Sequence, residues 1–272
     1  MAPADDIVFY DIASKQPLTT FGPNPWKTRL ALNFKGLPYK TQWVQMPDIS
    51  KVREELGIPA NRTLPDGTPY HTLPAMNDNG TLVGDSFEIA LHLDAAHPNT
   101  PRLFRPNTYG LTAAFNAYVD GIFTKHVGLS TKMPFDAAVE EEVMAIFAKR
   151  AGVEKLDDVQ PSEEERKSLL STFESALGEL AKAYQHTGGT TDWIWRPNGT
   201  DQAQRQRPPA GRKGTEIQLD GDEFVYADFI VGAWLKMMEG SIPDNEWQLV
   251  RGWHGGIWGR LVDALEPLTV MR

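Results

Sequence analysis

The sequence predicts two structural units of different class, an α/β unit followed by an all-helical unit. Over about the first hundred residues, short runs of β-type residues alternate with segments of helical periodicity, whereas the later part is helical almost throughout. Two stretches rich in proline and asparagine, at 97–101 and 105–107, separate these patterns. We therefore expect an α/β domain at 1–97, a linker at 98–106 and an all-helical domain at 107–272, for which the chain is long enough.

The elements of the α/β unit follow from local patterns. The run from Ile7 to Tyr10 is typical of a short buried strand, and Trp26, Leu30 and Phe34 recur at helical spacing. The sequence Asn77-Asp78-Asn79-Gly80 is a strong hairpin turn. In order, the expected elements are a strand at 7–10, a helix at 26–34, a strand at 39–44, a helix at 48–56, a strand at 70–76, a strand at 82–83 and a helix at 85–96.

The later part of the chain predicts helices interrupted by one polar insertion. The expected helices lie at 108–128, 136–151, 162–187, 226–239 and 244–266. The segment at about 198–222 holds several arginines and prolines and reads as a long exposed loop, with a small hairpin at 216–219 as an option. A solvated insertion is favoured there over a binding arm. The tryptophans near the C-terminus, Trp247, Trp253 and Trp258, most simply pack the helical core.

Pro74 is the residue that first indicates a ligand site. It lies inside the alternating run 70–76, where a proline cannot donate the hydrogen bond that a sheet needs. A cis Leu73–Pro74 peptide bond would turn the backbone outward, so that the amide and carbonyl of Leu73 could pair with a peptide-like ligand. Asp85 and Ser86 open the next helix, where a carboxylate suits an ammonium group and amides suit a carboxylate. The alternative is that Asp85 merely caps that helix.

Composition and charge exclude several classes of function. The formal net charge of -9 argues against nucleic acid and against an anionic membrane as the main partner. The chain has no cysteine, so any thiol chemistry must use a thiol that a ligand brings. The acidic N-terminus resembles no signal peptide, which favours a cytoplasmic location, and the pair His92 and His97 makes a poor metal site.

The whole pattern resembles the glutathione transferases, and among them the fungus-specific A class, which is related to the bacterial glutathione-dependent β-aryl etherases. The resemblance covers nearly the whole chain. It rests on Pro23-Asn24, Trp26-Lys27-Thr28-Arg29, Leu32-Asn33, Lys35-Gly36-Leu37-Pro38-Tyr39, Pro47-Asp48-Ile49, Pro65-Asp66-Gly67, Thr72-Leu73-Pro74 and Asp85-Ser86. It implies a thioredoxin-like N-terminal domain with a cis-proline, an all-helical C-terminal domain, glutathione as co-substrate, small aromatic molecules as partners and a homodimer.

The resemblance also implies where glutathione lies. The backbone of Leu73, before Pro74, would pair with the cysteinyl unit, and Asp85 and Ser86 would hold the γ-glutamyl end. For the glycine end, His71, Gln42 and Lys51 stay open as alternatives. The second substrate would lie over the sulfur. Five apolar side chains could line that cleft, namely Phe21, Tyr118, Phe123, Met133 and Phe135.

The position that activates the thiol departs from the family pattern. A free thiol has a pKa of about 8.5, so a transferase must stabilise the thiolate. Related proteins carry a serine just before the Pro-x-x-Trp stretch, and this chain has Gly22 there. Asn24, followed by Pro25, is the next candidate, because an asparagine N-cap leaves its NH2 group free to donate to sulfur. Thr19 or Thr20 is the alternative, and water must accept the thiol proton.

These expectations favour a glutathione transferase that cleaves β-aryl ethers, such as lignin-derived aromatics, by attack of the thiolate on the carbon that bears the ether oxygen. The alternative is a non-catalytic protein that binds hydrophobic or phenolic aromatic compounds, which Gly22 favours. A reductase of glutathionyl adducts is disfavoured because it usually needs a cysteine.

Overall fold

A four-stranded sheet forms the centre of the N-terminal half. The computed structural model describes residues 7–64, 66–155, 160–185, 219 and 224–272. The strands are β1 (Ile7–Ile12), β2 (Tyr39–Val44), β5 (Ala75–Asp78) and β6 (Thr81–Val83), in the spatial order β2-β1-β5-β6. β1 runs parallel to β2 and antiparallel to β5, and β5 pairs with β6 across the expected hairpin turn.

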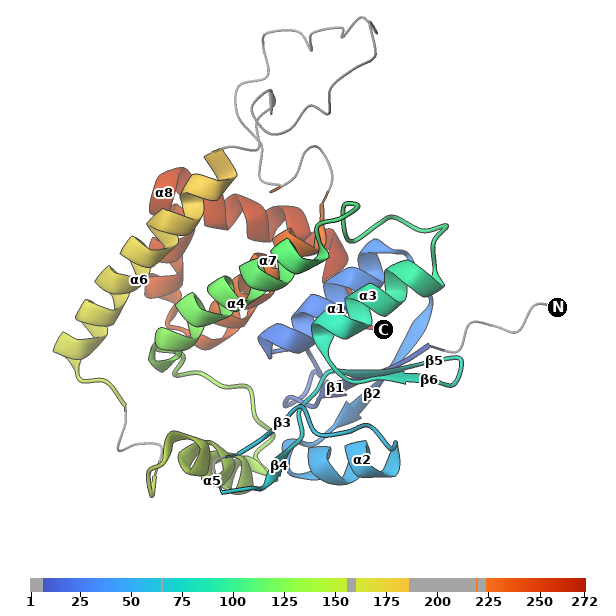
Figure 1. The fold of residues 1–272 in the computed structure, drawn as a ribbon. Coiled ribbons are helices and arrows are strands. Elements are labelled where there is room, and N and C mark those ends of the chain that lie inside the picture. The colour runs from blue at the N-terminus through green and yellow to red at the C-terminus, as the bar shows by residue number, and fades with distance from the viewer. Residues whose placement is uncertain (1–6, 65, 156–159, 186–218, 220–223) are drawn as a thin grey trace, which may run out of the picture.

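Helices cover both faces of this sheet. Figure 1 shows α1 (Pro23–Phe34) and α3 (Ser86–Ala96) on one face and α2 (Ile49–Glu55), which follows the short helix η1 (Met46–Asp48), on the other. α1 is buried along nearly its whole length because it lies between the sheet and the helical half. The expected thioredoxin-like arrangement is therefore confirmed.

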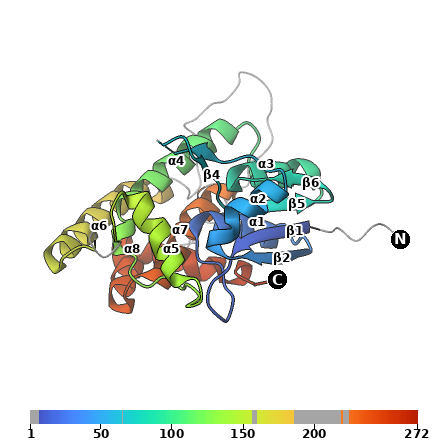
Figure 2. The same ribbon diagram turned by 90° about the horizontal axis from the view of Figure 1, so that it is seen from below.

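The C-terminal half consists of helices. They are α4 (Tyr109–Lys125), the short η2 (Val127–Leu129), α5 (Glu140–Ala151), α6 (Glu163–Gln185), α7 (Tyr226–Ser241), α8 (Asp244–Leu265) and the short η4 (Glu266–Leu268). α7 packs against α1, α4 and α8, and the view from below separates this bundle from the sheet (Figure 2). α5 stands apart from the bundle beside β4, where the Arg150 guanidinium lies 4.8 Å from the centre of the Tyr70 ring.

One core spans both halves of the molecule. Phe34 of α1 meets Phe229 of α7 edge to face, with ring centres 5.4 Å apart, so the interface of the two halves is packed like an interior. Trp247 and Trp258 are buried in the helical core as expected, whereas Trp253 is only partly buried. No helix among the residues that the structure describes has both the length and the apolarity to cross a membrane.

The expected strand at 70–76 is wrong. Two short strands, β3 (Arg62–Thr63) and β4 (Pro69–Tyr70), form a separate sheet, and β5 begins only after Pro74. The reason is that proline has no N–H to donate, so the ladder starts at the next residue. The Leu73–Pro74 bond is cis, as expected.

Two other parts of the helical half differ from expectation. The helix expected at 136–151 begins at Glu140, and α8 is interrupted at 253–256, where His254, Gly255 and Gly256 have left-handed backbone angles of 52°, 74° and 78° in φ. Gly-Gly favours such a break because glycine adopts positive φ without strain. The expected insertion at 198–222, with its optional hairpin, lies outside the described residues apart from Leu219.

Candidate functional site

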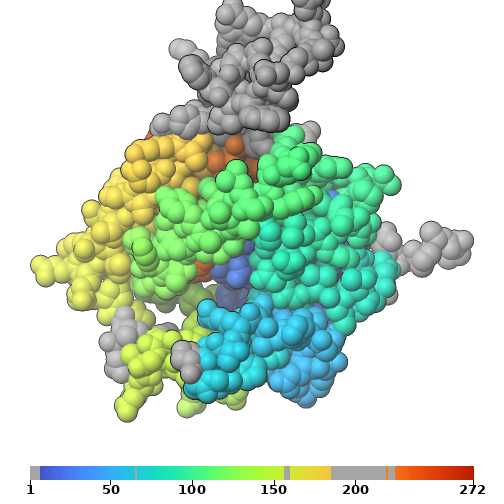
Figure 3. Space-filling view, viewed as in Figure 1, coloured from blue at the N-terminus to red at the C-terminus, as the bar shows by residue number. Residues whose placement is uncertain are grey.

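Two adjoining cavities lie in the cleft between the two halves. The first, here called the Gly22 cavity, has a volume of about 240 Å³ and brings Gly22, Asn24 and Leu73 together. The second, the His71 cavity, has a volume of about 540 Å³ and includes His71. Both share four lining residues, namely Met46, Ile49, Tyr70 and Arg150. In the space-filling view a hollow opens between α4 and the β3–β4 region, with residues of the blue N-terminal part at its floor (Figure 3).

The start of α1 forms one wall of the Gly22 cavity. Gly22, and not Asn24, is the N-cap, and its carbonyl accepts the Trp26 amide at 3.1 Å. The expected Asn24 cap is wrong because Pro23 already fits the first helical position, which places Asn24 second and Pro25 third. The two prolines have no N–H, so Asn24 supplies the single amide donor of the first three helical residues. Asn24 is exposed, and its side chain makes no cap bond.

Arg53 of α2 fixes the backbone on either side of the cis bond. Its buried guanidinium donates from Nη1 to the carbonyls of Thr72 at 2.8 Å and Gly84 at 2.9 Å, and from Nη2 to the Pro59 carbonyl. The Asn61 side chain adds two bonds, because its Oδ1 accepts the Thr72 amide at 3.0 Å and its Nδ2 donates to the Gly84 carbonyl at 3.0 Å. Arg53 and Asn61 thus join the segment before Leu73 to the segment before Asp85.

Only glycine fits at position 84, because the side chains of Ile58 and Arg53 leave no room for a Cβ atom. A Cβ atom there would lie 2.3 Å from Ile58 Cγ2 and 2.6 Å from Arg53 Nη2. The close approach of the Arg53 side chain therefore depends on a residue without a side chain. No local pattern predicts the roles of Arg53, Asn61 and Gly84, because their contacts join segments up to 31 residues apart.

Asp85 and Ser86 stand at the N-terminus of α3. Asp85 is exposed, and its Oδ1 accepts the amides of Phe87 at 2.8 Å and Glu88 at 3.4 Å, so the cap expected as the alternative is present. Ser86 is buried, and its carbonyl accepts the Tyr226 hydroxyl at 2.8 Å. Burial raises the pKa of Tyr226 well above its usual value, so this tyrosine stays a donor and ties α7 to the start of α3.

A buried lysine joins the halves behind the Gly22 cavity. The Nζ atom of Lys27 donates to Asn116 Oδ1 and to Asp120 Oδ1, each at 2.8 Å. Trp234, which lines the Gly22 cavity, donates from Nε1 to the same Asp120 oxygen at 2.6 Å. Burial lowers the pKa of Lys27, while the Asp120 and Asp85 carboxylates raise it. This network positions the Trp234 wall relative to α1.

The structure shows which of the residues expected to contact the second substrate line the cleft. Phe21 and Met133 line the Gly22 cavity, and Phe135 packs edge-on against Phe21 with ring centres 5.8 Å apart. Tyr118 is exposed and lines another cavity, which does not include Gly22 or Leu73, and Phe123 is fully buried and stacked on Trp234. The cleft-lining roles expected for Tyr118 and Phe123 are therefore wrong. Helical periodicity alone cannot tell which face of α4 meets the cleft.

The structure also distinguishes the three residues considered as contacts for the glycine end of glutathione. His71 lines the cavity that adjoins Leu73, and its Nδ1 is buried without a hydrogen-bond partner among the described residues. Gln42 and Lys51 line a separate depression beside Tyr10, so the structure does not bring them together with Leu73.

The alternative thiolate donors near the site differ in their surroundings. The Thr20 hydroxyl is buried, donates to Asp11 and accepts Arg29 Nε at 2.6 Å, so it is committed to the core. Thr19 donates its hydroxyl to the Thr20 carbonyl at 3.4 Å. Asn24 is therefore the candidate among these that lines the Gly22 cavity with Leu73.

Known proteins of similar sequence match both halves. Residues 21–96 match the family model of the glutathione S-transferase N-terminal domain, and residues 208–268 match that of the C-terminal domain. A glutathione S-transferase-like protein of Aspergillus flavus is 34% identical over 103 residues, which cover 34% of this chain and 36% of that protein. Another, of Beauveria bassiana, is 41% identical over 77 residues, or 26% of this chain and 34% of that protein. The aligned region thus spans about a third of the length of these curated relatives.

Solved structures match over nearly the full chain. A glutathione S-transferase of Ceriporiopsis subvermispora, solved in complex with glutathione, is 31% identical with a TM-score of 0.81 and covers 98% of both chains. Glutathione transferase GSTFuA3 of Phanerochaete chrysosporium is 26% identical with a TM-score of 0.76 and covers 99% of both chains. The resemblance to the fungus-specific A class is thereby confirmed, and the relation to β-aryl etherases stays a prediction. The chain belongs to the glutathione S-transferase family.

Proposed function

We propose that this protein binds glutathione in the cleft and transfers it to aromatic substrates, with β-aryl ether cleavage as the favoured reaction. The observation that carries the proposal is the Gly22 cavity itself. Its lining brings Asn24 and Leu73 together with the apolar side chains of Met133, Phe147 and Trp234. A cavity that combines a polar donor with apolar side chains suits a peptide thiol beside an aromatic ring.

In this reaction the thiol first gives its proton to water. The amide of Asn24, its side-chain NH2 group and the positive end of α1 stabilise the thiolate. The thiolate sulfur then forms a bond to the carbon that bears the aryl ether oxygen. The carbon–oxygen bond breaks, its electron pair leaves on the phenolate, and water protonates the phenolate. The protein contributes positioning and thiolate stabilisation.

The proposed contacts with glutathione are those expected from the sequence. Leu73 pairs with the cysteinyl unit, and Asp85 with Ser86 holds the γ-glutamyl end at the start of α3. Asp85 can cap α3 through Oδ1 and still attract an ammonium group, because the residue is exposed. We also expect a homodimer, which light scattering after size-exclusion chromatography tests.

Asn24→Ala tests the thiolate role. The pKa of the bound glutathione thiol is expected to rise and turnover to fall by about tenfold, as for the loss of one donor bond to a charged group. Asn99→Ala, in the exposed linker, is the matched control. An unchanged thiol pKa and unchanged turnover would contradict the proposed role of Asn24 in stabilising the thiolate.

The second candidate is a non-catalytic protein that binds aromatic compounds, and Gly22 favours it because the serine hydroxyl of related proteins is missing. One assay separates the two. The protein is incubated with glutathione and a fluorogenic β-aryl ether ketone, and the released phenol is measured. Binding of the ketone without release of phenol favours the binding protein.

A further inference from the structure

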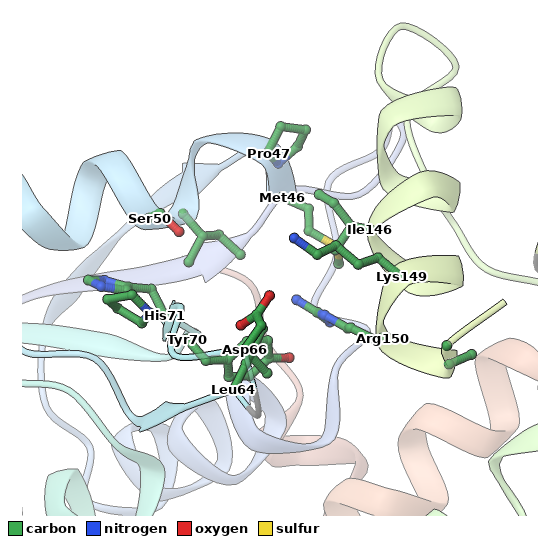
Figure 4. Close-up of a pocket in the computed structure, with 14 residues that line it drawn as sticks. Met46, Pro47, Ser50, Leu64, Asp66, Tyr70, His71, Ile146, Lys149 and Arg150 are labelled. Carbon is green, nitrogen blue, oxygen red and sulfur yellow. The ribbon is translucent and has the colours of Figure 1, made fainter. Parts of the chain in front are cut away.

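Two guanidinium groups lie against the ring of Tyr70, a residue that lines both cavities. The guanidinium groups of Arg62 and Arg150 lie 4.6 Å and 4.8 Å from the ring centre. Lys149, the neighbour of Arg150 on α5, lines the His71 cavity with it. In Figure 4 the side-chain nitrogens of Lys149 and Arg150 point away from α5, toward the wall that carries Tyr70 and His71.

These cations lack acidic partners. Within the part of the chain that the structure describes, neither Arg62, Lys149 nor Arg150 forms an ion pair, although the whole chain carries a net charge of -9. Partial burial lowers the pKa of Arg150, and the charge of Arg62 lowers it further. The two cations that line the His71 cavity, Lys149 and Arg150, carry like charges that an anion between or beside them would stabilise.

One carboxylate of the chain, that of Asp66, also lines this cavity. Its Oδ1 accepts the Thr68 amide at 2.9 Å, and this bond with the nearby Lys149 lowers the pKa of Asp66. Among the described residues no ion pair joins Asp66 to these cations, so it offsets their charge only in part. With Asp66 counted, the cations still leave an excess of positive charge at the cavity.

We infer that Arg150, assisted by Lys149, forms a subsite for a carboxylate group of the bound ligand, supplied by the helical half across the cleft. The inference rests on the proposed binding of glutathione and an aromatic substrate. Arg150 lines both cavities, so it can reach a carboxylate that extends from the Gly22 cavity toward His71. The planar guanidinium suits a carboxylate because it can donate two parallel bonds.

The carboxylate has two possible sources, which share this chemistry. It is either the glycine carboxylate of glutathione or a carboxylate on the aromatic substrate. Glutathione that enters with its cysteinyl unit at Leu73 and its γ-glutamyl end at Asp85 directs its glycine end away from α3, toward the His71 cavity. An aromatic acid in the Gly22 cavity would approach the same guanidinium from the apolar side.

The test compares wild type with Arg150→Gln, and with Arg102→Gln as a matched control on an exposed linker arginine. Calorimetry gives the Kd for glutathione and for its glycine ethyl ester, which lacks that carboxylate. Turnover gives the KM for chlorodinitrobenzene and for chlorodinitrobenzoate. Asp66→Asn, which removes the competing carboxylate, is expected to tighten binding of the carboxylate ligand.

The expected result is an increase of about tenfold to hundredfold in Kd or KM for one carboxylate ligand in Arg150→Gln, with no change for its neutral counterpart. A change confined to glutathione identifies the glycine carboxylate, and a change confined to the benzoate identifies the aromatic acid. Equal constants in Arg150→Gln and wild type for all four ligands overturn the subsite. Binding of glutathione without any turnover contradicts the proposed transferase reaction and leaves the calorimetric result on the subsite intact. If wild type binds no carboxylate ligand, both proposals are overturned.

Discussion

Replacement of Arg53 by lysine tests how the cleft backbone is held. The guanidinium donates three bonds from two diverging nitrogens, to the carbonyls of Thr72, Gly84 and Pro59. A lysine ammonium is a single nitrogen that ends one bond short of these positions, so Arg53→Lys keeps the charge and loses one or two of the bonds. The carbonyls that lose their donor stay inside the protein.

The expected loss in the free energy of unfolding follows from the number of hydrogen bonds that Arg53→Lys removes. Each hydrogen bond from a charged donor contributes about 1.5 to 3 kcal/mol, so one bond at the upper value or two at the lower value give about 3 kcal/mol. Against a typical free energy of unfolding of about 5 to 15 kcal/mol, the variant is expected to fold with reduced stability. Glutathione binding is expected to weaken as well, because Thr72 and Gly84 directly precede Leu73 and Asp85.

Urea unfolding followed by tryptophan fluorescence measures the loss of stability, and calorimetry measures glutathione affinity. Arg102→Lys, on an exposed linker residue, is the matched control and is expected to change the free energy of unfolding by less than about 0.5 kcal/mol. A loss below about 1 kcal/mol in Arg53→Lys, together with unchanged affinity, would refute the reasoning that these bonds hold the two segments.

Two further predictions concern the thiol position and acid stability. Gly22→Ser is expected to lower the pKa of bound glutathione and raise turnover. Gly22 has an ordinary φ of -77°, and the new Cβ would lie 3.2 Å from Pro25 Cδ, a tight contact that a small shift of the Pro25 ring relieves. Stopped-flow titration of the thiolate checks this, and a serine variant no faster than wild type would speak against it. Burial raises the pKa of Asp78, but the hydrogen bonds from His92 at 2.7 Å and His97 at 2.9 Å outweigh burial and bring it below 3.8. The carboxylate therefore stabilises the fold above pH 3.8, and this contribution is lost as the pH falls through the folded-state pKa. Asp78→Asn is expected to lower the free energy of unfolding by about 1 to 3 kcal/mol near neutral pH and by less in acid, and a loss that stays constant down to pH 3 in urea titrations would contradict it.

Apart from β3 and β4, local sequence patterns predict the order of elements, the change from an α/β half to a helical half and the cis bond before Pro74. These features depend on local physics. Helical spacing such as that of Trp26, Leu30 and Phe34, the Asn79-Gly80 turn and the missing N–H of Pro74 act within a few residues, so they can be read without knowledge of the partner segments. The conclusion that a ligand must bring any thiol also needs no structure, because the chain contains no cysteine.

Which side chains meet at the cleft depends on how the elements pack against one another in three dimensions. Tyr118 and Phe123 have the right chemistry, but the rotation of α4 turns one outward and buries the other against Trp234. Arg53 joins carbonyls from three segments, and Arg150 reaches the cleft from α5, which is distant in sequence from Tyr70. Such contacts depend on how whole elements pack, so no local pattern encodes them.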